Sequence, residues 1–388
     1  MTPSDPHSRL EAWGLARCPM AELERLEPCL ARLSAAFTDN RPERYTAYLD
    51  DPDTLTAYAL YFAPQTVART EAALRGILAR LPKLPRQSLR VLDLGCGLGS
   101  AALAAAAVLT EATGHAPEVT CLDWSAAALA ACAELLPGAR TVQGDLRRDL
   151  GAGSYDLILS SFAFNEAFPR TAEALAALES LLSRLSPEPD IAPFLLLLEP
   201  ASRLDTPRFL TLRTRFPDHP LYAPCPHRRT CPLMALDEGF CHDVRRFRPR
   251  RATTLLNRRL RRTIADVKFA LLAFGRRGGP QAEGFGEAEF LRMIGPMDKA
   301  KGVLTCRACM GDGALCRVEV PSAALTSARR HELLARERGD CAWLDGPLEA
   351  RRRLQNGQIQ RAGDLRFTDE APLTLHDEPE DDTFSFSI

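Results

Sequence analysis

Two different spacings of hydrophobic and polar residues divide the chain. From residue 8 to about residue 82, apolar residues recur every three or four positions, as in "AELERLEPCLARLSAAF", and this spacing predicts helices. After "LPKLPRQS", short runs rich in Val, Leu and Ile alternate with Ala-rich segments. The runs occupy residues 90–97, 118–124, 139–145, 155–162 and 193–200. Continuous apolar strands separated by helices predict a parallel sheet that is covered on both faces.

The alternation stops after Pro200, and strand-like runs return only at residues 266–277 and 314–323. We therefore expect a helical amino-terminal module (1–85), an α/β core (86–200) and an insertion rich in Cys and Arg (201–265). Residues 266–346 should supply strands that complete the sheet. Residues 347–388, which end in the acidic "DEPEDDTFSFSI", should be a partly disordered tail.

Composition narrows the classes of protein that remain. Hydrophobic residues make up 46% of the chain, enough for a sizeable core. No apolar run approaches the roughly 18 residues of a membrane span, and the amino terminus lacks the pattern of a secretory signal. We expect a reducing compartment, the bacterial cytoplasm, with the mitochondrial matrix as the alternative. The twelve cysteines should then bind metal or take part in chemistry instead of forming disulfides.

The segment "VLDLGCGLGS" places three glycines between the first strand and the following helix. Glycines there let the backbone approach a ligand closely at the edge of the sheet where such folds bind ligands. Acids end three successive strands: Asp93 in the first, Asp123 in the second and Asp145 after the third. The "DLGCG" segment with its acid resembles the first motif of class I S-adenosylmethionine (SAM)-dependent methyltransferases, which predicts their Rossmann-like, doubly wound fold. The expected SAM-binding residues are Asp93, Gly95, Gly97, Gly99, Asp123, Trp124, Asp145 and Leu146.

The segment after the fourth strand, "SSFAFNEAFPR", is where methyl-transfer chemistry is expected. It contains neither the Asn-Pro-Pro-Tyr type of motif nor a Pro-Cys pair. Asn165 and Glu166 are the polar side chains there that could position a nucleophile, so they are the candidate catalytic residues. The alternative is that both simply begin a helix.

Three cysteines, Cys225, Cys231 and Cys241, lie in the insertion among Pro, His and Arg residues, where a core role is a poor explanation. Thiolates are soft ligands that suit zinc or an iron–sulfur cluster, and such a site usually needs a fourth ligand. The candidates for the fourth ligand are His227, His242, Cys306 and Cys309. Alternatively, "APC" and "LTC" resemble the cysteine pairs of RNA cytosine-5 methyltransferases. Cys96, Cys121 and Cys132 are most simply core residues.

Net charge is near zero, with 49 basic and 50 acidic residues, but the segment "VRRFRPRRATTLLNRRLRR" has no acid. Arginines in such a stretch can pair with phosphates and stack on unpaired bases of RNA. A solvated helix face is the alternative. The candidate RNA-binding residues are Arg245, Arg246, Arg248, Arg250, Arg251, Arg258, Arg259, Arg261 and Arg262.

Taken in order, "YFAPQTVARTEAAL", "VLDLGCGLGS", "LLLEPAS", "APCPHRRTCPL", "FCHD", "KFALLAF", "CRACMGDG" and "ARERGDCAWLD" resemble one family. It comprises the methyltransferase-like proteins that assemble the small subunit of the mitochondrial ribosome and their bacterial relatives. The resemblance covers roughly residues 45–346.

The family resemblance implies a 4Fe-4S cluster on Cys225, Cys231, Cys241 and Cys309, with Cys306 as the alternative fourth ligand and zinc as the alternative metal. It also implies a SAM-binding protein that acts on or binds the small ribosomal subunit or its RNA. The alternatives are a catalytically inactive assembly factor and a zinc-containing RNA methyltransferase. One departure is Asp243, where the family usually has an aromatic residue after Cys-His.

Overall fold

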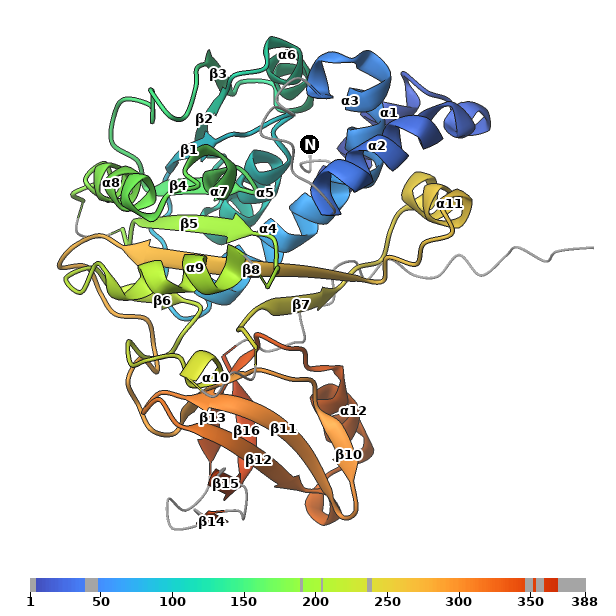
Figure 1. Cartoon of the computed structure of the whole chain (residues 1–388). Coiled ribbons are helices and arrows are strands. Elements are labelled where there is room, and N and C mark those ends of the chain that lie inside the picture. The colour runs from blue at the N-terminus through green and yellow to red at the C-terminus, as the bar shows by residue number, and fades with distance from the viewer. Residues whose placement is uncertain are drawn as a thin grey trace, which may run out of the picture.

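The structure is a computed structural model of the chain, and it describes residues 5–38, 48–188, 191–203, 205–235, 239–345, 352–353 and 359–368. These residues form two bodies, each built around its own sheet (Figure 1). Among the described residues, none of the helices combines the length and the hydrophobicity needed to cross a lipid bilayer.

The amino-terminal residues form helices, two of which begin at capping aspartates. The elements are α1 (Pro6–Leu15), η1 (Met20–Leu26), α2 (Glu27–Thr38), η2 (Tyr48–Asp50), α3 (Pro52–Tyr61) and α4 (Ala63–Leu78). Asp5 accepts a hydrogen bond from Ser8 N and Asp51 accepts one from Thr54 N, each just before a proline that begins a helix. The predicted boundary at residue 85 does not separate these helices from the core, because α4 packs against the first sheet through Leu74 and Ile77.

The first sheet has eight strands in the order β3-β2-β1-β4-β5-β8-β6, with β7 paired to β8. The strands are β1 (Arg90–Leu94), β2 (Glu118–Asp123), β3 (Arg140–Gln143), β4 (Leu157–Ser161), β5 (Phe194–Glu199), β6 (Leu221–Ala223), β7 (Asp243–Arg246) and β8 (Asp266–Gly275). Strands β1 to β5 run parallel, and β8 lies antiparallel to β5. The Rossmann-like class I methyltransferase fold that the sequence predicts is confirmed.

Helices cover both faces of this sheet, as the continuous apolar strands require. One face packs against α4, α5 (Ser100–Thr113) and α6 (Ala126–Leu135). The other packs against α7 (Phe164–Ala167), α8 (Thr171–Leu182) and α9 (Asp205–Thr211), which continues into η3 (Leu212–Thr214). This two-sided cover leaves the carboxyl ends of β1 to β4 as the edge where a ligand can enter.

The second sheet has the order β14-β15-β12-β11-β9-β13-β16, with β10 paired to β11. Its elements are β9 (Phe290–Met293), β10 (Asp298–Ala300), β11 (Val303–Met310), β12 (Leu315–Pro321), η4 (Ser322–Ala324), α12 (Ser327–Ala335), β13 (Cys341–Asp345), β14 (Arg352–Arg353), β15 (Ile359–Ala362) and β16 (Asp364–Phe367). A separate core that includes Leu291, Leu304 and Val318 holds it together.

This second sheet corrects the prediction that residues 266–346 complete the first sheet, because only β8 does so. Strand β8 is continuously buried from Phe269 onward and suits a sheet covered on both faces. In β12, by contrast, buried and partly exposed residues alternate, which is typical of a sheet with one covered face. Part of the predicted tail forms β14 to β16, and residues 369–388 lie outside the described residues.

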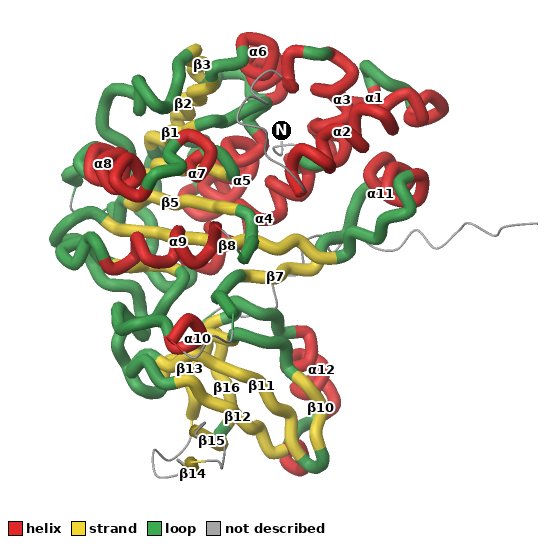
Figure 2. Tube along the Cα trace, in the orientation of Figure 1, coloured by secondary structure: helices red, strands yellow, loops and turns green. Residues whose placement is uncertain are grey.

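The insertion joins the two bodies. It contains α9, η3, β6, α10 (Pro232–Ala235), β7 and α11 (Arg251–Arg259). Figure 1 shows α10 and β7 between the two sheets. Figure 2 shows α11 on the other side, beside the amino-terminal helices, where Ala252 and Leu256 pack against a core that includes Leu23 and Leu60.

Candidate cofactor pocket and four-cysteine site

The glycine loop after β1 adopts a backbone that only glycine tolerates well. Gly95, Gly97 and Gly99 have φ angles of 68°, 54° and 84°, in the left-handed region. A Cβ atom on Gly95 would lie 2.3 Å from the Cβ atom of Ala163, and one on Gly99 would lie 2.6 Å from Cys132 Sγ. The loop therefore packs directly against the segment after β4 and against α6.

Two buried carboxylates hold this loop in place. Asp93 Oδ2 accepts a hydrogen bond of 3.0 Å from Ala102 N in the first turn of α5. Asp123 accepts hydrogen bonds from Gly97 N (2.8 Å) and Ser125 N (2.9 Å). Burial raises the pKa of Asp123 in spite of these donors, and it raises the pKa of Asp93 well above its usual value. Asp93 Oδ1 is buried and has no hydrogen-bond partner.

A cavity of about 680 Å³ opens at the carboxyl ends of β1 to β4, which is the volume of a site for a small molecule. It brings together seven of the eight predicted cofactor residues: Asp93, Gly95, Gly97, Asp123, Trp124, Asp145 and Leu146. Gly99 is outside the lining, since it is the N-cap of α5 and packs on Cys132. Trp124 is 43% exposed at this cavity, and Asp145 forms an ion pair of 2.8 Å with Arg147, which lowers the pKa of Asp145.

The two candidate catalytic residues have different positions. Glu166 lines the cavity, whereas Asn165 does not. The Asn165 side chain is buried and has no hydrogen-bond partner, and its backbone N donates to Glu199 Oε1 over 2.9 Å. The short helix α7 thus turns the Asn165 side chain into the protein, and its role in positioning a nucleophile stays a prediction.

The cavity also contains residues to which the sequence analysis gave no role. Tyr58, Gln65 and Arg69 reach it from α3 and α4, Phe162 from the segment after β4, and Lys268 from β8. The motif "YFAPQTVARTEAAL", most of which lies in α4, is one of the segments that carry the family resemblance, but its helical spacing does not indicate which face of the helix meets the cavity. Phe162 has a φ of 62°, a rare value for a residue other than glycine.

The structure brings Cys225, Cys231, Cys241 and Cys309 together at the junction of the two bodies. Cys225 follows β6, Cys231 precedes α10, Cys241 lies just before β7, and Cys309 belongs to β11 of the second sheet. All four side chains are buried. Each of the other three thiols raises the pKa of Cys309 by electrostatic repulsion, after the larger effect of burial. Three thiols from the insertion and one from the other body thus lie near one another.

Cys306, the alternative fourth ligand, lies elsewhere. It is buried in the core of the second sheet, whereas Cys309 packs with Cys231 and Cys241. Residues three apart on a strand point to opposite faces. His227 Nε2 lies 3.1 Å from Cys309 Sγ, and His242 Nδ1 lies 3.3 Å from Phe240 O.

Arginine side chains hold the loops that carry these cysteines. Arg213 donates to the carbonyl oxygens of His227 (2.9 Å) and Arg229, across the loop from Cys225 to Cys231. Arg338 donates to the carbonyl oxygens of Phe240 (2.8 Å) and His242 (3.0 Å), on both sides of Cys241. These bonds fix the backbone of irregular loops that cannot satisfy their own carbonyl groups.

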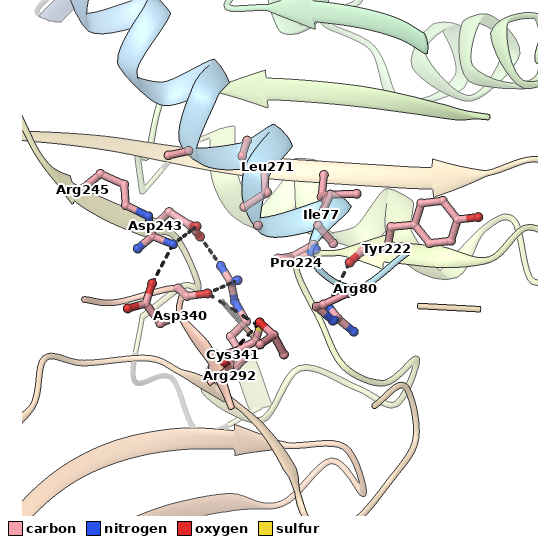
Figure 3. A pocket seen from close by; sticks show the side chains of 16 residues that line it. Ile77, Arg80, Tyr222, Pro224, Asp243, Arg245, Leu271, Arg292, Asp340 and Cys341 are labelled. Carbon is pink, nitrogen blue, oxygen red and sulfur yellow. Dashed lines mark hydrogen bonds and ion pairs between the residues drawn. The ribbon is translucent and has the colours of Figure 1, made fainter. Parts of the chain in front are cut away.

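A buried ion-pair network lies near the four cysteines, and Figure 3 shows its members Asp243, Arg245, Arg292 and Asp340. Arg292, directly opposite Cys309 in the β9–β11 register, forms an ion pair with Asp243. Burial lowers the pKa of Arg292, but Asp243 and the nearby Cys241 raise it well above its usual value. Arg245 pairs with Asp243 (3.3 Å) and Asp340 (3.2 Å). Asp243, which departs from the family pattern, is therefore a buried link between β7 and the second sheet.

This network also corrects one RNA-binding prediction. The Arg245 side chain is only 4% exposed, so it cannot contact RNA. Arg250 pairs with Asp5 at 2.5 Å, and Arg259 pairs with Glu27 at 2.9 Å. Arg246 pairs with Glu337 at 3.5 Å, and Arg262 donates to Ser34. Four exposed arginines have no ion-pair partner in the described part of the chain: Arg248, Arg251, Arg258 and Arg261.

A second group of thiols lies beneath the glycine loop. The sulfur atoms of Cys96, Cys121 and Cys132 are all within 4.8 Å of one another, and among the described residues this is the one such set of potential metal ligands. All three belong to the apolar core between the sheet and its helices. This placement agrees with the core role predicted for them.

Comparison with known proteins identifies the family. The model of the family described as "Mitochondrial small ribosomal subunit Rsm22" matches residues 52–334. The chain belongs to the Rsm22 family. No curated protein matches the chain.

Solved structures that resemble this Rsm22-family chain include several methyltransferases. They include CalS10, a SAM-bound amino pentose methyltransferase from Micromonospora echinaspora (28% identity, 34% of this chain, 50% of that chain, TM-score 0.26). DesVI from Streptomyces venezuelae has 22% identity over 37% of this chain and 55% of that chain, with a TM-score of 0.29. A TehB-like SAM-dependent methyltransferase from Corynebacterium glutamicum has 18% identity over 54% of this chain and 87% of that chain, with a TM-score of 0.31. The match spans about half of the first two structures, so the fold assignment rests on the strand order.

Proposed function

We propose that the protein binds SAM, holds a 4Fe-4S cluster and acts on or binds the small ribosomal subunit. The observation that carries the first part is the cavity at the carboxyl ends of β1 to β4, where three acids from successive strand ends meet the glycine loop. A dinucleotide-binding fold uses a similar loop, but the antiparallel β8 between β5 and β6 distinguishes this sheet from that fold.

The residues of the cavity fit SAM in charge and shape. Asp123 is placed to accept hydrogen bonds from ribose hydroxyl groups, because its backbone donors leave lone pairs of both oxygens free. The exposed Trp124 ring can cover the adenine, and Asp145 can approach the adenine amino group. The unpartnered Oδ1 of Asp93 supports a polar ligand group there. When bound, SAM would supply an electrophilic methyl group.

Binding of S-adenosylhomocysteine, measured by calorimetry, tests this pocket. Asp123→Asn should weaken binding about 10- to 100-fold, the effect of losing hydrogen bonds to a charged acceptor. Glu118→Gln is the matched control, because Glu118 is exposed at the opposite end of the same strand. Equal affinities of Asp123→Asn and the wild type would argue against this ribose site.

Whether the methyl group is transferred is a separate question. In favour of an enzyme, Glu166 lines the cavity; in favour of an inactive assembly factor, Asn165 points away from it. Methyl incorporation into naked and subunit-bound small-subunit RNA, with Asp93→Ala as the control, separates the two. No incorporation under any condition would leave the assembly-factor function.

The four-cysteine site fits a cluster better than it fits a single zinc ion. A zinc ion bound by thiolates at about 2.3 Å requires sulfur atoms about 3.8 Å apart. Among the described cysteines, no three of the four sulfur atoms lie within 4.8 Å of one another, so they are not spaced as a single zinc ion requires. The cationic Arg292 and Arg213 favour the thiolate forms, because both lower the pKa of Cys225 against the larger effect of burial.

Metal analysis after anaerobic purification tests the cluster and its fourth ligand together. The wild type should be brown and contain about four iron atoms per chain. Cys309→Ser should lose most of this iron, whereas the matched variant Cys306→Ser on the same strand should keep it. A colourless wild type with one zinc ion per chain would refute the iron–sulfur proposal.

The ribosomal partner is supported by the description of the family and by the exposed arginines of α11. Arg251 and Arg258 lie seven residues apart, on one face of the helix. Replacing both with Gln should reduce the slope of log affinity for small-subunit RNA against log salt by about 1.4 to 1.8. Arg277→Gln, on an exposed residue beyond the opposite end of β8, should leave the slope unchanged.

An unchanged slope in the double variant would show that α11 does not contact phosphates. The family description names a mitochondrial protein, which matches the alternative compartment of the sequence analysis more closely than the bacterial cytoplasm.

A further inference from the structure

Arg69 is a charged side chain of the cofactor pocket that has no ion-pair partner among the described residues. Arg69, on the face of α4 that meets the cavity, lines it with its guanidinium carbon 4.8 Å from the centre of the Phe162 ring. Its Nη2 donates to Gln65 Oε1 over 3.3 Å, and its buried Nε has no hydrogen-bond partner. No carboxylate forms an ion pair with Arg69 in the described part of the chain, although Glu166 lines the same cavity.

Three buried arginines in the described part of the chain have stronger partners than Arg69 has. Arg245 and Arg292 pair with buried carboxylates, and Arg80 donates to the carbonyl oxygens of Tyr222 and Glu283. Among the described residues, Arg69 contacts the side-chain amide oxygen of Gln65 and the face of the Phe162 ring. A partly buried cation without an anion beside it is unfavourable, and desolvation lowers the pKa of Arg69 to about 10. The site is thus organised to receive an anionic group.

The position of Arg69 identifies which part of a ligand it would meet. Phe162 is followed by Ala163, which packs against Gly95 next to Asp93. Trp124 and Asp145, by contrast, lie after β2 and β3. Arg69 and Asp93 therefore belong to one end of the cavity and the proposed adenine site to the other. An amino-acid group carries an ammonium and a carboxylate, and this end offers the carboxyl group of Asp93 and the guanidinium of Arg69.

We propose that Arg69 binds the carboxylate of the amino-acid end of the cofactor and so selects ligands that carry an amino-acid group. This inference rests on the proposed SAM binding and adds a residue and a ligand group to it. Guanidinium and carboxylate have matching planar geometry, which favours a charge-assisted pair. A phosphate of RNA that enters the same cavity is the other source of an anion.

Two ligands that differ only at the amino-acid end test the proposal. S-adenosylhomocysteine has the carboxylate, and 5′-methylthioadenosine keeps the adenosine but lacks the amino-acid group. In Arg69→Met, affinity for S-adenosylhomocysteine should fall about 10- to 100-fold, the effect of losing a hydrogen bond to a charged group. Affinity for 5′-methylthioadenosine should stay within about twofold, and Arg69→Lys should recover part of the loss.

The control and the folding check come from the same helix. Arg75 pairs with Glu111 on the surface, so Arg75→Met should leave both affinities unchanged. Without ligand, Arg69→Met should unfold at the same temperature as the wild type or higher, because the substitution removes an uncompensated charge. If Arg69 had a merely structural role, its substitution would instead weaken the binding of both ligands and lower the unfolding temperature.

The outcomes separate this inference from the proposed function. If Arg69→Met binds S-adenosylhomocysteine as tightly as the wild type does, the carboxylate assignment is overturned while SAM binding stands. If that variant loses affinity only for small-subunit RNA, the anion is a phosphate and the assignment is again overturned. If the wild type binds neither adenosine ligand, both proposals fail.

Discussion

The ion-pair network beside the four cysteines allows a quantitative prediction for Asp243→Asn. Asp243 pairs with Arg292 through one oxygen and with Arg245 at 3.3 Å through the other, and all three side chains are about 4% exposed. Asn keeps the shape of the side chain but removes its charge. Arg245 retains Asp340, whereas Arg292 loses its carboxylate and keeps a hydrogen bond to Gly339 O.

The magnitude follows from these contacts. At 3.3 Å and an effective dielectric constant of about 20, one such pair has a Coulomb energy of about 5 kcal/mol. Removing one partner of a buried pair typically costs about 3–5 kcal/mol, because it leaves an uncompensated charge. We therefore expect Asp243→Asn to lower the free energy of unfolding by about 3–5 kcal/mol. Since Cys241 and Cys309 both adjoin Arg292, iron content should fall as well.

Urea denaturation followed by circular dichroism measures this loss, with iron content measured on the same samples. The matched control is Asp345→Asn, since Asp345 pairs with Arg366 at 3.5 Å on the surface, where the two side chains are 57% and 63% exposed. The free energy of unfolding of that variant should differ from that of the wild type by less than about 1 kcal/mol. The reasoning would be refuted if Asp243→Asn also stayed within about 1 kcal/mol and kept its iron.

Two further predictions concern the same junction. Burial raises the pKa of Glu337 to about 7, so between pH of about 4.5 and 7 the folded state binds more protons than the unfolded state. The stability of the wild type should therefore fall relative to that of Glu337→Gln as pH rises through this window. A difference in urea midpoints that does not change with pH would contradict this. Gly339 has a φ of 110°, and a Cβ atom there would lie 2.4 Å from Asp243 Oδ2. Gly339→Ala should therefore lower the melting temperature by clearly more than the control Gly278→Ala, because Gly278 is also left-handed but faces open space. Equal melting temperatures of the two variants would count against the clash.

The cofactor pocket is the part of the site that the sequence determined most fully. Acids at the ends of strands that lie side by side in a parallel sheet must meet at one edge, so Asp93, Asp123 and Asp145 could be grouped from spacing alone. Arg69 could not, because every turn of a helix offers several faces and only the packing of α4 against the sheet decides which one meets the cavity.

Tertiary structure decided the four-cysteine site. Cys306 and Cys309 are equivalent in spacing, but alternation along β11 places them on opposite faces, and only one face meets the insertion. The same holds for Arg245, which sequence grouped with exposed arginines and which the second sheet buries. Local pattern fixes which residues can form a strand, a loop or a thiolate ligand. Which of them meet depends on contacts between segments far apart in the chain, and these exist only once the two bodies pack together.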